Sequence, residues 1–431
     1  MKYISTNGKS ASVTFREATL SGQAPDGGLY FPEKIPALPV NFLKNLKNKS
    51  KADIAFEVIR PFTGETIPDE TLFQICAETV NFDFPLIKIT ENIRALELFH
   101  GATLAFKDVG AKFMSRCLQY FSAEKGAKTI VIVATSGDTG GAVASGFLSA
   151  ENVEVVILYP SGKVSKVQEL QLTTLGQNIT ALEVEGTFDD CQMLAKKALA
   201  DDEIKRKVFL TSANSINVAR WLPQQFYYFY ALQQWNEEDA PVVSVPSGNF
   251  GNVCAGLLAD ASGLPAAKFI AACNANDIVL RFLQTGEMVS KTSVATISNA
   301  MDVGNPSNFV RILKLFNNDS DKLRERMEAV SVSDETTANT MREVYKKRGY
   351  ILDPHGAVGF YALQKYLEQN PNEKGIFLAT AHPVKFDSVK EILGTSGTMP
   401  TAVEELLSRP KQSTEIKVSY DDLKDILLSK I

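Results

Sequence analysis

Histidine and paired cysteines are scarce in this chain. Only three histidines occur, His100, His355 and His382, and they lie far apart in the sequence. The five cysteines are scattered and include no CxxC pair. A histidine-rich metal site is therefore not expected, and we predict no metal centre. The cysteines are predicted to be reduced, mostly buried thiols of a cytosolic protein.

Long apolar runs and an excess of one charge are also absent. Since no run of about 18 or more apolar residues occurs, no membrane span is predicted. Residues 1–15, MKYISTNGKSASVTF, contain neither an apolar h-region nor an arginine-rich transit pattern, so a cytoplasmic location is expected. The formal net charge of −5 argues against a general affinity for nucleic acid or anionic membranes.

The length of 431 residues predicts two or three globular domains. The first part of the chain has few strong strand signals, apart from a turn at 25–28 that precedes a short extended piece at 29–32. We predict a small N-terminal domain over residues 1–85, a catalytic α/β region of two subdomains over 86–386, and a helical C-terminal segment over 387–431.

Strand and helix patterns alternate from about residue 86 onward. Apolar runs, rich in β-branched residues, are typical of strands covered on both faces, and they occur at 129–134, 153–159, 208–211, 242–245, 269–272 and 375–380. Apolar residues spaced about one turn apart from Val109 to Phe121 predict a helix, and Asp189 or Asp190 lies near the start of another. This alternation predicts an α/β fold with two parallel sheets and a cleft between them.

Polar loops follow several of these strands, and ligands of open parallel sheets bind beyond the carboxyl ends of the strands. The loop 135–141, TSGDTGG, combines small residues with hydroxyls at a helix start, which suits a carboxylate or a phosphate. The alternative is an ordinary N-capped turn. The loop 246–252, PSGNFGN, is neither a Walker A loop nor GxGxxG, so it favours a single phosphate over a nucleotide, with a plain turn as the alternative.

Two further strand ends carry candidate binding groups. Asn214, Asn217 and Arg220 recur at three-residue spacing after the strand at 208–211, so one face of a helical turn is predicted to present two amides and a guanidinium. Arginine suits a dianion; the alternative, which the spacing alone favours slightly, is a surface arginine with capping asparagines. After the last strand, Thr380 is a candidate hydrogen-bond partner for a ring nitrogen, whereas His382 alone is more typical of a structural role.

Lys107 is the sharpest candidate, because it follows the apolar residues Leu104, Ala105 and Phe106. Burial would lower its pKa, and a neutral amine can attack an aldehyde and later carry protons. The alternative is a lysine that extends to solvent beside Asp108. A buried lysine together with a phosphate loop indicates pyridoxal 5'-phosphate as cofactor.

Taken in order, these motifs resemble those of the threonine synthase family, a group of fold-type II pyridoxal-phosphate enzymes, in its bacterial and fungal branch. The resemblance extends over nearly the whole chain and rests on residues 15–18, 22–32, 99–108, 136–140, 214–221, 247–252 and 380–386. It implies a tryptophan synthase β-like fold, in which two parallel-sheet α/β domains hold the cofactor in their cleft and a small N-terminal domain is added.

The resemblance also implies residue roles. Lys107 is the catalytic lysine that forms the Schiff base with the cofactor. The cofactor-binding residues would be Lys107, Gly248, Asn249, Phe250, Gly251, Asn252, Thr380 and Asp138, and the substrate-binding residues would be Ser136, Thr139, Asn214, Asn217 and Arg220. Asn252 departs from the aspartate that this branch often has at that position.

The implied reaction is a lyase reaction on O-phospho-L-homoserine. Phosphate is eliminated from the γ-carbon and water adds to the β-carbon, which gives L-threonine in the last step of threonine biosynthesis. A serine or threonine dehydratase, a β-replacing enzyme of the same fold, or a catalytically silent homologue that binds the cofactor are the alternatives. We expect a monomer or a weak homodimer that binds neither nucleic acid nor membrane.

Overall fold

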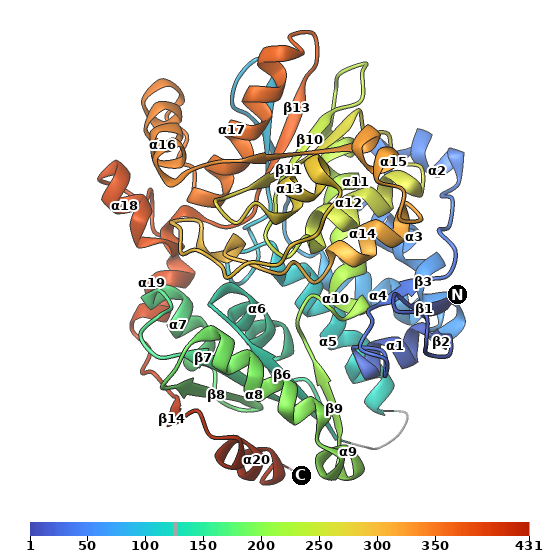
Figure 1. Cartoon of the computed structure of the whole chain (residues 1–431), viewed down its shortest axis with the longest axis vertical. Helices are drawn as coiled ribbons and strands as arrows, with labels where there is room; N and C mark the ends of the chain where they lie inside the picture. Colours follow the sequence, from blue (N-terminus) through green and yellow to red (C-terminus); the bar gives the residue numbers. More distant parts are fainter. Residues whose placement is uncertain (124–127, 431) are drawn as a thin grey trace.

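Two parallel sheets, one above the other in Figure 1, organise the chain, and a smaller N-terminal unit lies beside them. The computed structural model describes residues 1–123 and 128–430. The α/β architecture predicted from the sequence is confirmed. Among the described residues, no helix is long and apolar enough to cross a membrane.

The six-stranded sheet has the order β12-β11-β10-β13-β5-β4. Its strands are β4 (Leu86–Lys88), β5 (Ile93–Glu97), β10 (Val242–Pro246), β11 (Lys268–Cys273), β12 (Met327–Ser331) and β13 (Gly375–Ala379). All pairs are parallel except β4, which pairs antiparallel with β5 at one edge. Helix α17 (Pro354–Gln369) packs against β10, β11 and β13.

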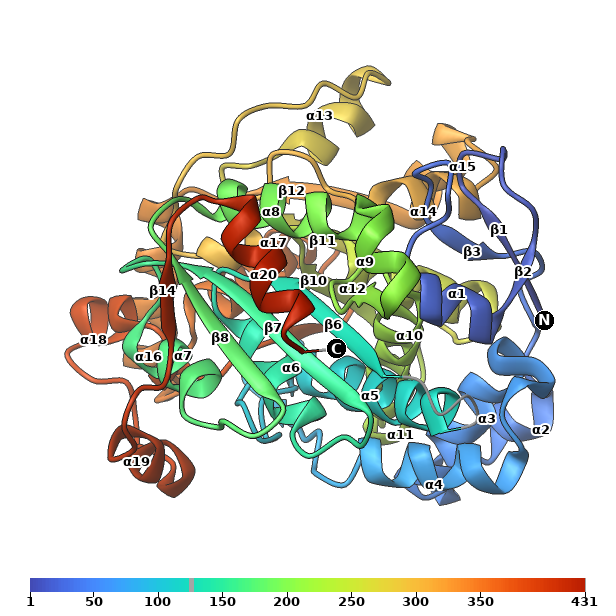
Figure 2. The ribbon, with the colours of Figure 1, turned by 90° about the horizontal axis from the view of Figure 1, so that it is seen from below.

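The five-stranded sheet has the order β14-β8-β7-β6-β9 and is parallel throughout. Its strands are β6 (Thr129–Ala134), β7 (Val153–Pro160), β8 (Ile179–Val184), β9 (Phe209–Ser212) and β14 (Thr414–Ile416). Alternate residues of β6 enter different cores: Val131 and Val133 join the core that includes helix α5, and Ile130 and Ile132 join the core that includes α8 and α20. Figure 2 shows helices on both faces of this sheet, which explains the continuous apolar runs.

The helices of these two layers are α5 (Lys107–Ala123), α6 (Asp138–Phe147), α7 (Lys166–Thr173), α8 (Phe188–Ala200), α9 (Asp202–Lys207), α10 (Val218–Trp221), α11 (Phe226–Gln234), α12 (Gly251–Ala261), α13 (Ile278–Thr285), α14 (Phe309–Leu315), α15 (Ser320–Arg326), α16 (Asp334–Arg348), α17, α18 (Asp387–Leu393), α19 (Thr401–Leu407) and α20 (Tyr420–Leu428). The predicted helix near Asp190 is α8. It begins after Thr187, whose side chain forms a capping box with Asp190.

The N-terminal unit combines a three-stranded antiparallel sheet with four helices. The sheet has the order β2-β1-β3, formed by β1 (Lys2–Ser5), β2 (Val13–Thr14) and β3 (Tyr30–Pro32). The helices are α1 (Phe15–Ser21), α2 (Val40–Lys44), α3 (Lys51–Thr63) and α4 (Asp69–Thr79). The predicted small N-terminal domain is confirmed, and its strands gave weak signals because they are only two to four residues long.

The C-terminal segment is only partly helical. Besides α18, α19 and α20 it contains β14, which extends the five-stranded sheet beside β8 and which the sequence did not indicate. A three-residue strand at a sheet edge has too short a pattern to be recognised. The boundaries proposed at residues 85 and 386 stay predictions, and Ile431 lies outside the described residues.

Candidate active site between the two parallel sheets

Lys107 is the first residue of α5, and the chain just before it is fixed on two sides. The amide of Phe106 donates to the carbonyl of Thr380, at the end of β13, over 2.9 Å. The carbonyl of Phe106 accepts a hydrogen bond from the hydroxyl of Tyr227 on α11. The backbone just before the lysine is thus held against the end of β13 and against α11 by contacts that do not involve the lysine side chain.

Two side-chain bridges show that the carboxyl ends of the two sheets face each other. Asn249, which follows β10, donates to the hydroxyl of Ser215, which follows β9, over 2.8 Å. Lys385, which follows β13, pairs with Asp138, which follows β6, over 2.8 Å. Each bridge joins a loop of one sheet to a loop of the other, so the polar loops singled out in the sequence surround a common space.

The amine of Lys107 is a candidate for the general base. Burial is the largest cause that lowers its pKa; Asp138 acts in the opposite direction, while the charges of Lys385 and Arg220 lower it further. Its side chain keeps partial exposure. In the described ranges no ion pair or hydrogen bond is found for the amine. It lies over the ring of Phe106, 5.8 Å from the ring centroid.

The loop after β6 is shaped by Thr135 and Gly137. The Thr135 hydroxyl accepts the amides of Gly137 and Gly140 over 3.0 and 2.9 Å. Gly137 has φ +137°, and a Cβ there would lie 2.5 Å from the side chain of Gln168, so only glycine fits. Of the residues assigned to substrate, Ser136 is exposed and Thr139 half-buried. Both are therefore accessible to a ligand.

Asp138 begins α6 and is almost fully buried, with 6% of its surface exposed. Its Oδ1 accepts from Lys385 Nζ over 2.8 Å and from Gln168 Nε2 over 2.8 Å. Burial opposes its charge, but the attraction of Lys385 and Lys107 outweighs burial and holds the pKa of Asp138 well below its usual range. The carboxylate stays ionised near Lys107.

The loop after β10 fits a phosphate. Phe250 adopts a left-handed conformation (φ +60°) just before α12, and a Cβ at Gly248 would lie 2.5 Å from Cα of Met301. Among the described residues, no acceptor is found for the backbone amides of residues 248–251. The side-chain nitrogen of Asn252 is buried and has no partner either. Unused donors at the start of an eleven-residue helix suit a phosphate group.

Asn214, Asn217 and Arg220 do not share one helical face, because α10 begins only at Val218. Asn217 caps that helix by accepting from the amide of Ala219, and its nitrogen donates to the carbonyl of Thr19 in the N-terminal unit. The predicted substrate contact of Asn217 thus has competing structural partners.

Asn214 and Arg220 are differently placed. Asn214 is half-buried and donates to the carbonyl of Ala134 at the end of β6 over 3.2 Å. Arg220 is 3% exposed; one of its terminal nitrogens donates to the carbonyl of Ala213, whereas its Nε is buried and has no partner among the residues described. Burial lowers its pKa to about 10, so it remains charged at neutral pH. A buried guanidinium with an unused donor suits an anionic ligand.

Sequence reasoning missed a network that joins the loops after β9 and β10. Ser215 accepts from the side chains of Asn249 and Asn308, over 2.8 and 3.0 Å. Arg311 on α14 donates to the carbonyls of Ser215 and Ile216. Nothing in the spacing pointed to Asn308 or Arg311, since both lie far along the chain. Ser215 lies inside the motif that was singled out, as does Lys385.

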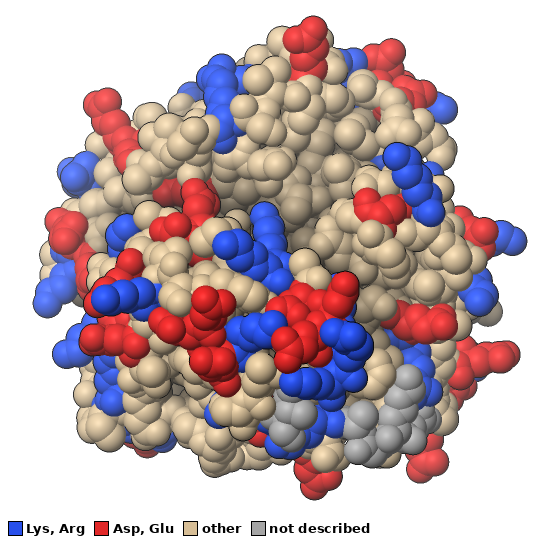
Figure 3. Space-filling model, turned by 60° about the horizontal axis from the view of Figure 1, so that its bottom comes forward, with Lys and Arg blue, Asp and Glu red and all other residues tan. Residues whose placement is uncertain are grey.

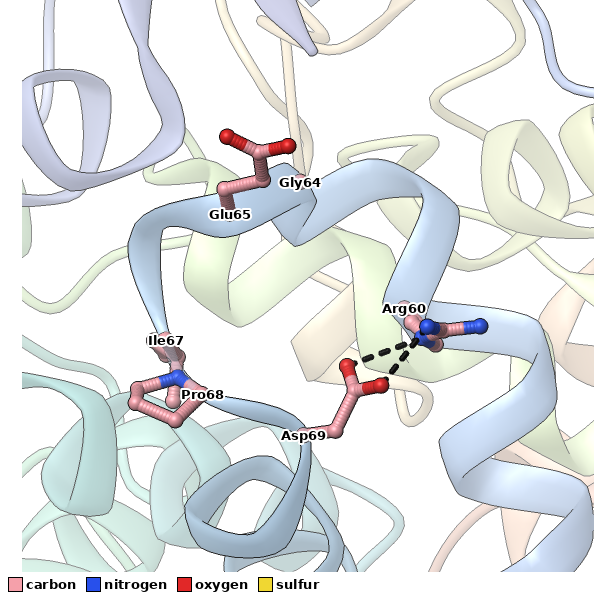
Figure 4. Close-up of a pocket in the computed structure, with 6 residues that line it drawn as sticks. All are labelled: Arg60, Gly64, Glu65, Ile67, Pro68 and Asp69. Carbon is pink, nitrogen blue, oxygen red and sulfur yellow. Dashed lines mark hydrogen bonds and ion pairs between the residues drawn. The ribbon is translucent and has the colours of Figure 1, made fainter.

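A separate hollow in the N-terminal unit contains none of these residues. Figure 4 shows its lining by Arg60, Gly64, Glu65, Ile67, Pro68 and Asp69. Its arginine and aspartate already pair with each other over 2.6 Å, and both are more than half exposed. None of the residues assigned to the cofactor or the substrate lines this hollow. No group of three or more histidine, cysteine, aspartate or glutamate side chains within residues 1–123 and 128–430 is arranged to hold a metal ion.

Two features together define the class of protein. One is Lys107, with its lowered pKa, and the other is the anion loop at the carboxyl end of β10. Residues 89–380 match the family described as pyridoxal-phosphate dependent enzyme. The structure of threonine synthase from Brucella melitensis with bound PLP superposes with a TM-score of 0.93 at 35% identity, covering 99% of this chain and 98% of the other. The chain is a member of this pyridoxal-phosphate class.

The flanking regions narrow the class further. Residues 2–80 match the family described as threonine synthase N terminus, and residues 356–427 match threonine synthase, C-terminal. The threonine synthase of Serratia marcescens is 42% identical over 99% of both chains. The structure of that from Escherichia coli gives a TM-score of 0.92 at 41% identity, with full coverage of both. The chain belongs to the threonine synthase family.

Proposed function

We propose that this protein converts O-phospho-L-homoserine and water into L-threonine and phosphate, with pyridoxal 5'-phosphate as cofactor. Full-length similarity to proteins described as threonine synthases supports the proposal. The observation that carries it is the position of Lys107. Within the described residues its amine has no ion-pair or hydrogen-bond partner and has a lowered pKa, and the charge of Arg220, a buried arginine with an unused donor, acts on it. The loop of free amides after β10 meets the loop after β9 through Asn249 and Ser215.

The cofactor would be held by groups from both sheets. Lys107 would bind its aldehyde carbon, and the amides of residues 248–251 with Asn252 would bind its phosphate. Thr380 would face the ring nitrogen and Asp138 the ring hydroxyl. When bound, the cofactor draws electrons away from the substrate Cα and weakens the bonds there. Asn252 in place of aspartate leaves this phosphate loop neutral.

Lys107 would carry the protons of the reaction. Once the substrate amine had replaced it, its own amine would take the proton from Cα and pass it to the phosphate group of the substrate, which needs one proton to leave. Neutral again, it would take a proton from Cβ as phosphate departs. It would give that proton to Cγ, take one from the water that adds to Cβ, and finally return this proton to Cα. One base that serves several steps needs a pKa close to the working pH. Burial lowers the pKa of Lys107 in that direction.

Arg220 and Asn214 would bind the phosphate that leaves from Cγ. A charge that develops on a leaving group is stabilised most by donors that are already in place and shielded from water. Arg220 is buried and keeps one donor unused. Ser136 and Thr139 would bind the substrate carboxylate. Asn217 stays a predicted substrate contact, although its side chain already makes two structural hydrogen bonds.

The test is release of threonine and phosphate from O-phospho-L-homoserine by the holoenzyme, with Lys107→Ala as the variant. We expect equal amounts of both products from the wild type and none above background from the variant. Lys112→Ala, on the same helix and half-buried, is the matched control and should keep its activity. A keto acid in place of threonine would support a dehydratase, and activity of Lys107→Ala would disprove the assignment of the base.

We also propose a cytoplasmic monomer or weak homodimer that binds neither nucleic acid nor membrane. The five cysteines are free and buried, which suits a reducing compartment. Figure 3 shows acidic and basic side chains interspersed over one face, with no broad patch of positive charge there. Light scattering across a concentration series measures the assembly state, and a mass that stays at four subunits would contradict the proposal.

A further inference from the structure

Lys385 is the buried cation that the proposed reaction does not yet use. It ends the short 3-10 helix Pro383–Lys385 that follows β13, and 1% of its surface is exposed. Its Nζ contacts Asp138 Oδ1 over 2.8 Å and the carbonyl of Thr103 over 2.7 Å. Burying a charged lysine costs free energy unless the charge is paired, so a buried ammonium group at this position needs a specific partner.

The position of Lys385 is fixed from several sides. Its carbonyl accepts from the hydroxyl of Ser165, which caps α7, over 2.9 Å. The preceding residue, Val384, packs in a small apolar cluster with Leu104 and Val167. Lys385 therefore keeps its ammonium group on Asp138 with little freedom to move elsewhere.

Asp138 has two lysines in its surroundings but a contact with only one. Lys385 and Lys107 both stabilise its charge. Yet Lys385 forms the ion pair, and no ion pair joins Asp138 to Lys107 within the described residues. The carboxylate of Asp138 is thus paired with Lys385, and the amine of Lys107 is left without a counter-ion.

We propose that Lys385 is a positioning residue for the reaction, which holds Asp138 in an ion pair and so keeps the amine of Lys107 free to accept a proton. The proposal rests on the proposed role of Lys107 as the base. Without Lys385, Asp138 would remain as an unpaired buried carboxylate, and the nearest cation able to neutralise it would be Lys107.

The charges around Lys107 make the direction of the effect clear. Asp138 on α6 raises its pKa, while Lys385 and Arg220 on α10 lower it. Asp108 and Tyr227 are also close to Lys107. Burial raises the pKa of both groups, because burial favours the neutral form of a carboxyl or a phenol. Loss of Lys385 removes a repelling cation and frees an attracting carboxylate, and both changes raise the pKa of Lys107.

The main experiment compares Lys385→Met with Lys385→Arg in the holoenzyme. The pH dependence of kcat reports groups in the enzyme–substrate complex, where Lys107 must be neutral to take a proton. We expect the acidic midpoint of kcat to move up by about one to two pH units in Lys385→Met. It should stay near the wild-type position in Lys385→Arg, which keeps the charge. A uniform loss of kcat with an unmoved midpoint would mean a purely structural lysine and overturn the proposal.

A second readout does not depend on the reaction. The acetylation rate of Lys107 by acetic anhydride, followed by mass spectrometry across pH in full-length protein without cofactor, gives the titration of this amine. The midpoint should rise in Lys385→Met and return towards wild type in Lys385→Met/Asp138→Asn, which removes both charges. An unchanged midpoint in the single variant, or no return in the double variant, would overturn the proposal.

Controls separate the possible failures. Lys374→Met removes another lysine ion pair, with Glu237 at 2.7 Å, at the opposite end of β13 and should move neither midpoint. If Lys385→Met does not fold, Asp138→Asn alone serves, because it should lower the Lys107 labelling midpoint; no change would overturn the proposal. If the wild type lacks activity on O-phospho-L-homoserine, the proposed function fails while the labelling experiment still decides the role of Lys385.

Discussion

Two buried arginines, Arg311 and Arg220, lie beside the same polypeptide turn but differ in their hydrogen bonds. They are 0% and 3% exposed, and burial lowers the pKa of each to about 10. Arg311 donates to the carbonyls of Tyr30, Ser215 and Ile216 and to the side chain of Asn308, at distances between 2.6 and 3.1 Å. Its guanidinium also stacks over Trp221 at 4.4 Å.

Arg220 makes far less use of its donors. Only its bond to the Ala213 carbonyl is made, and its Nε has no partner in the described part of the chain. A satisfied buried arginine stabilises the fold, whereas an unsatisfied one costs free energy until an anion arrives. Burial alone therefore does not separate a structural arginine from a binding one, and the count of unused donors does.

The largest expected effect is that of Arg220→Met on catalysis. We expect kcat/KM for O-phospho-L-homoserine to fall by roughly 10²- to 10³-fold, because a donor to the leaving phosphate is lost. The melting temperature should stay the same or rise, since an unsatisfied buried charge is removed. Steady-state kinetics and thermal melting of the same preparation test both parts. A large loss of stability with unchanged kinetics would make Arg220 equivalent to Arg311.

Arg311→Met should show the reverse pattern. Four acceptors lose their donor, among them the Tyr30 carbonyl of the N-terminal unit, so the apparent free energy of unfolding should fall by about 3–5 kcal/mol. Urea denaturation measures this. Arg311→Lys should recover part of the stability because it keeps the charge but not the fork of donors. If Arg311→Met were as stable as wild type, the comparison between the two arginines would fail.

Ser215→Ala should have the smallest effect and reports on the coupling of the two loops. It removes the acceptor that Asn249 and Asn308 share, which is worth about 1 kcal/mol. We expect the affinity for pyridoxal phosphate to weaken about fivefold, because Asn249 lies in the proposed phosphate loop. Fluorescence titration of the apoprotein measures this. Ser429→Ala, which changes an exposed serine directly after α20, should leave the affinity unchanged. An unaffected Ser215→Ala would argue that the loops are independent.

Much of the architecture could be predicted because strong local patterns produced it. The six apolar runs form strands within one or two residues of their predicted ends, since both faces of each sheet are covered by helices. The strands β1, β2, β4, β5, β12 and β14 were not foreseen, because two to five residues carry too little periodicity. Thr380 and Lys107 were predicted as partners of one ligand, and the structure places their backbone segments in direct contact.

The sequence alone determined the fold class, the strand ends that carry polar loops, and the lysine that follows an apolar run, because these depend on local periodicity and residue chemistry. Only the tertiary structure decided which charges meet. Lys385 and Asp138 lie far apart along the chain, yet they pair at 2.8 Å. Arg311 and Arg220 look alike as letters and differ only in the acceptors around them. Electrostatics and hydrogen bonds depend on distance in space, which no one-dimensional pattern contains.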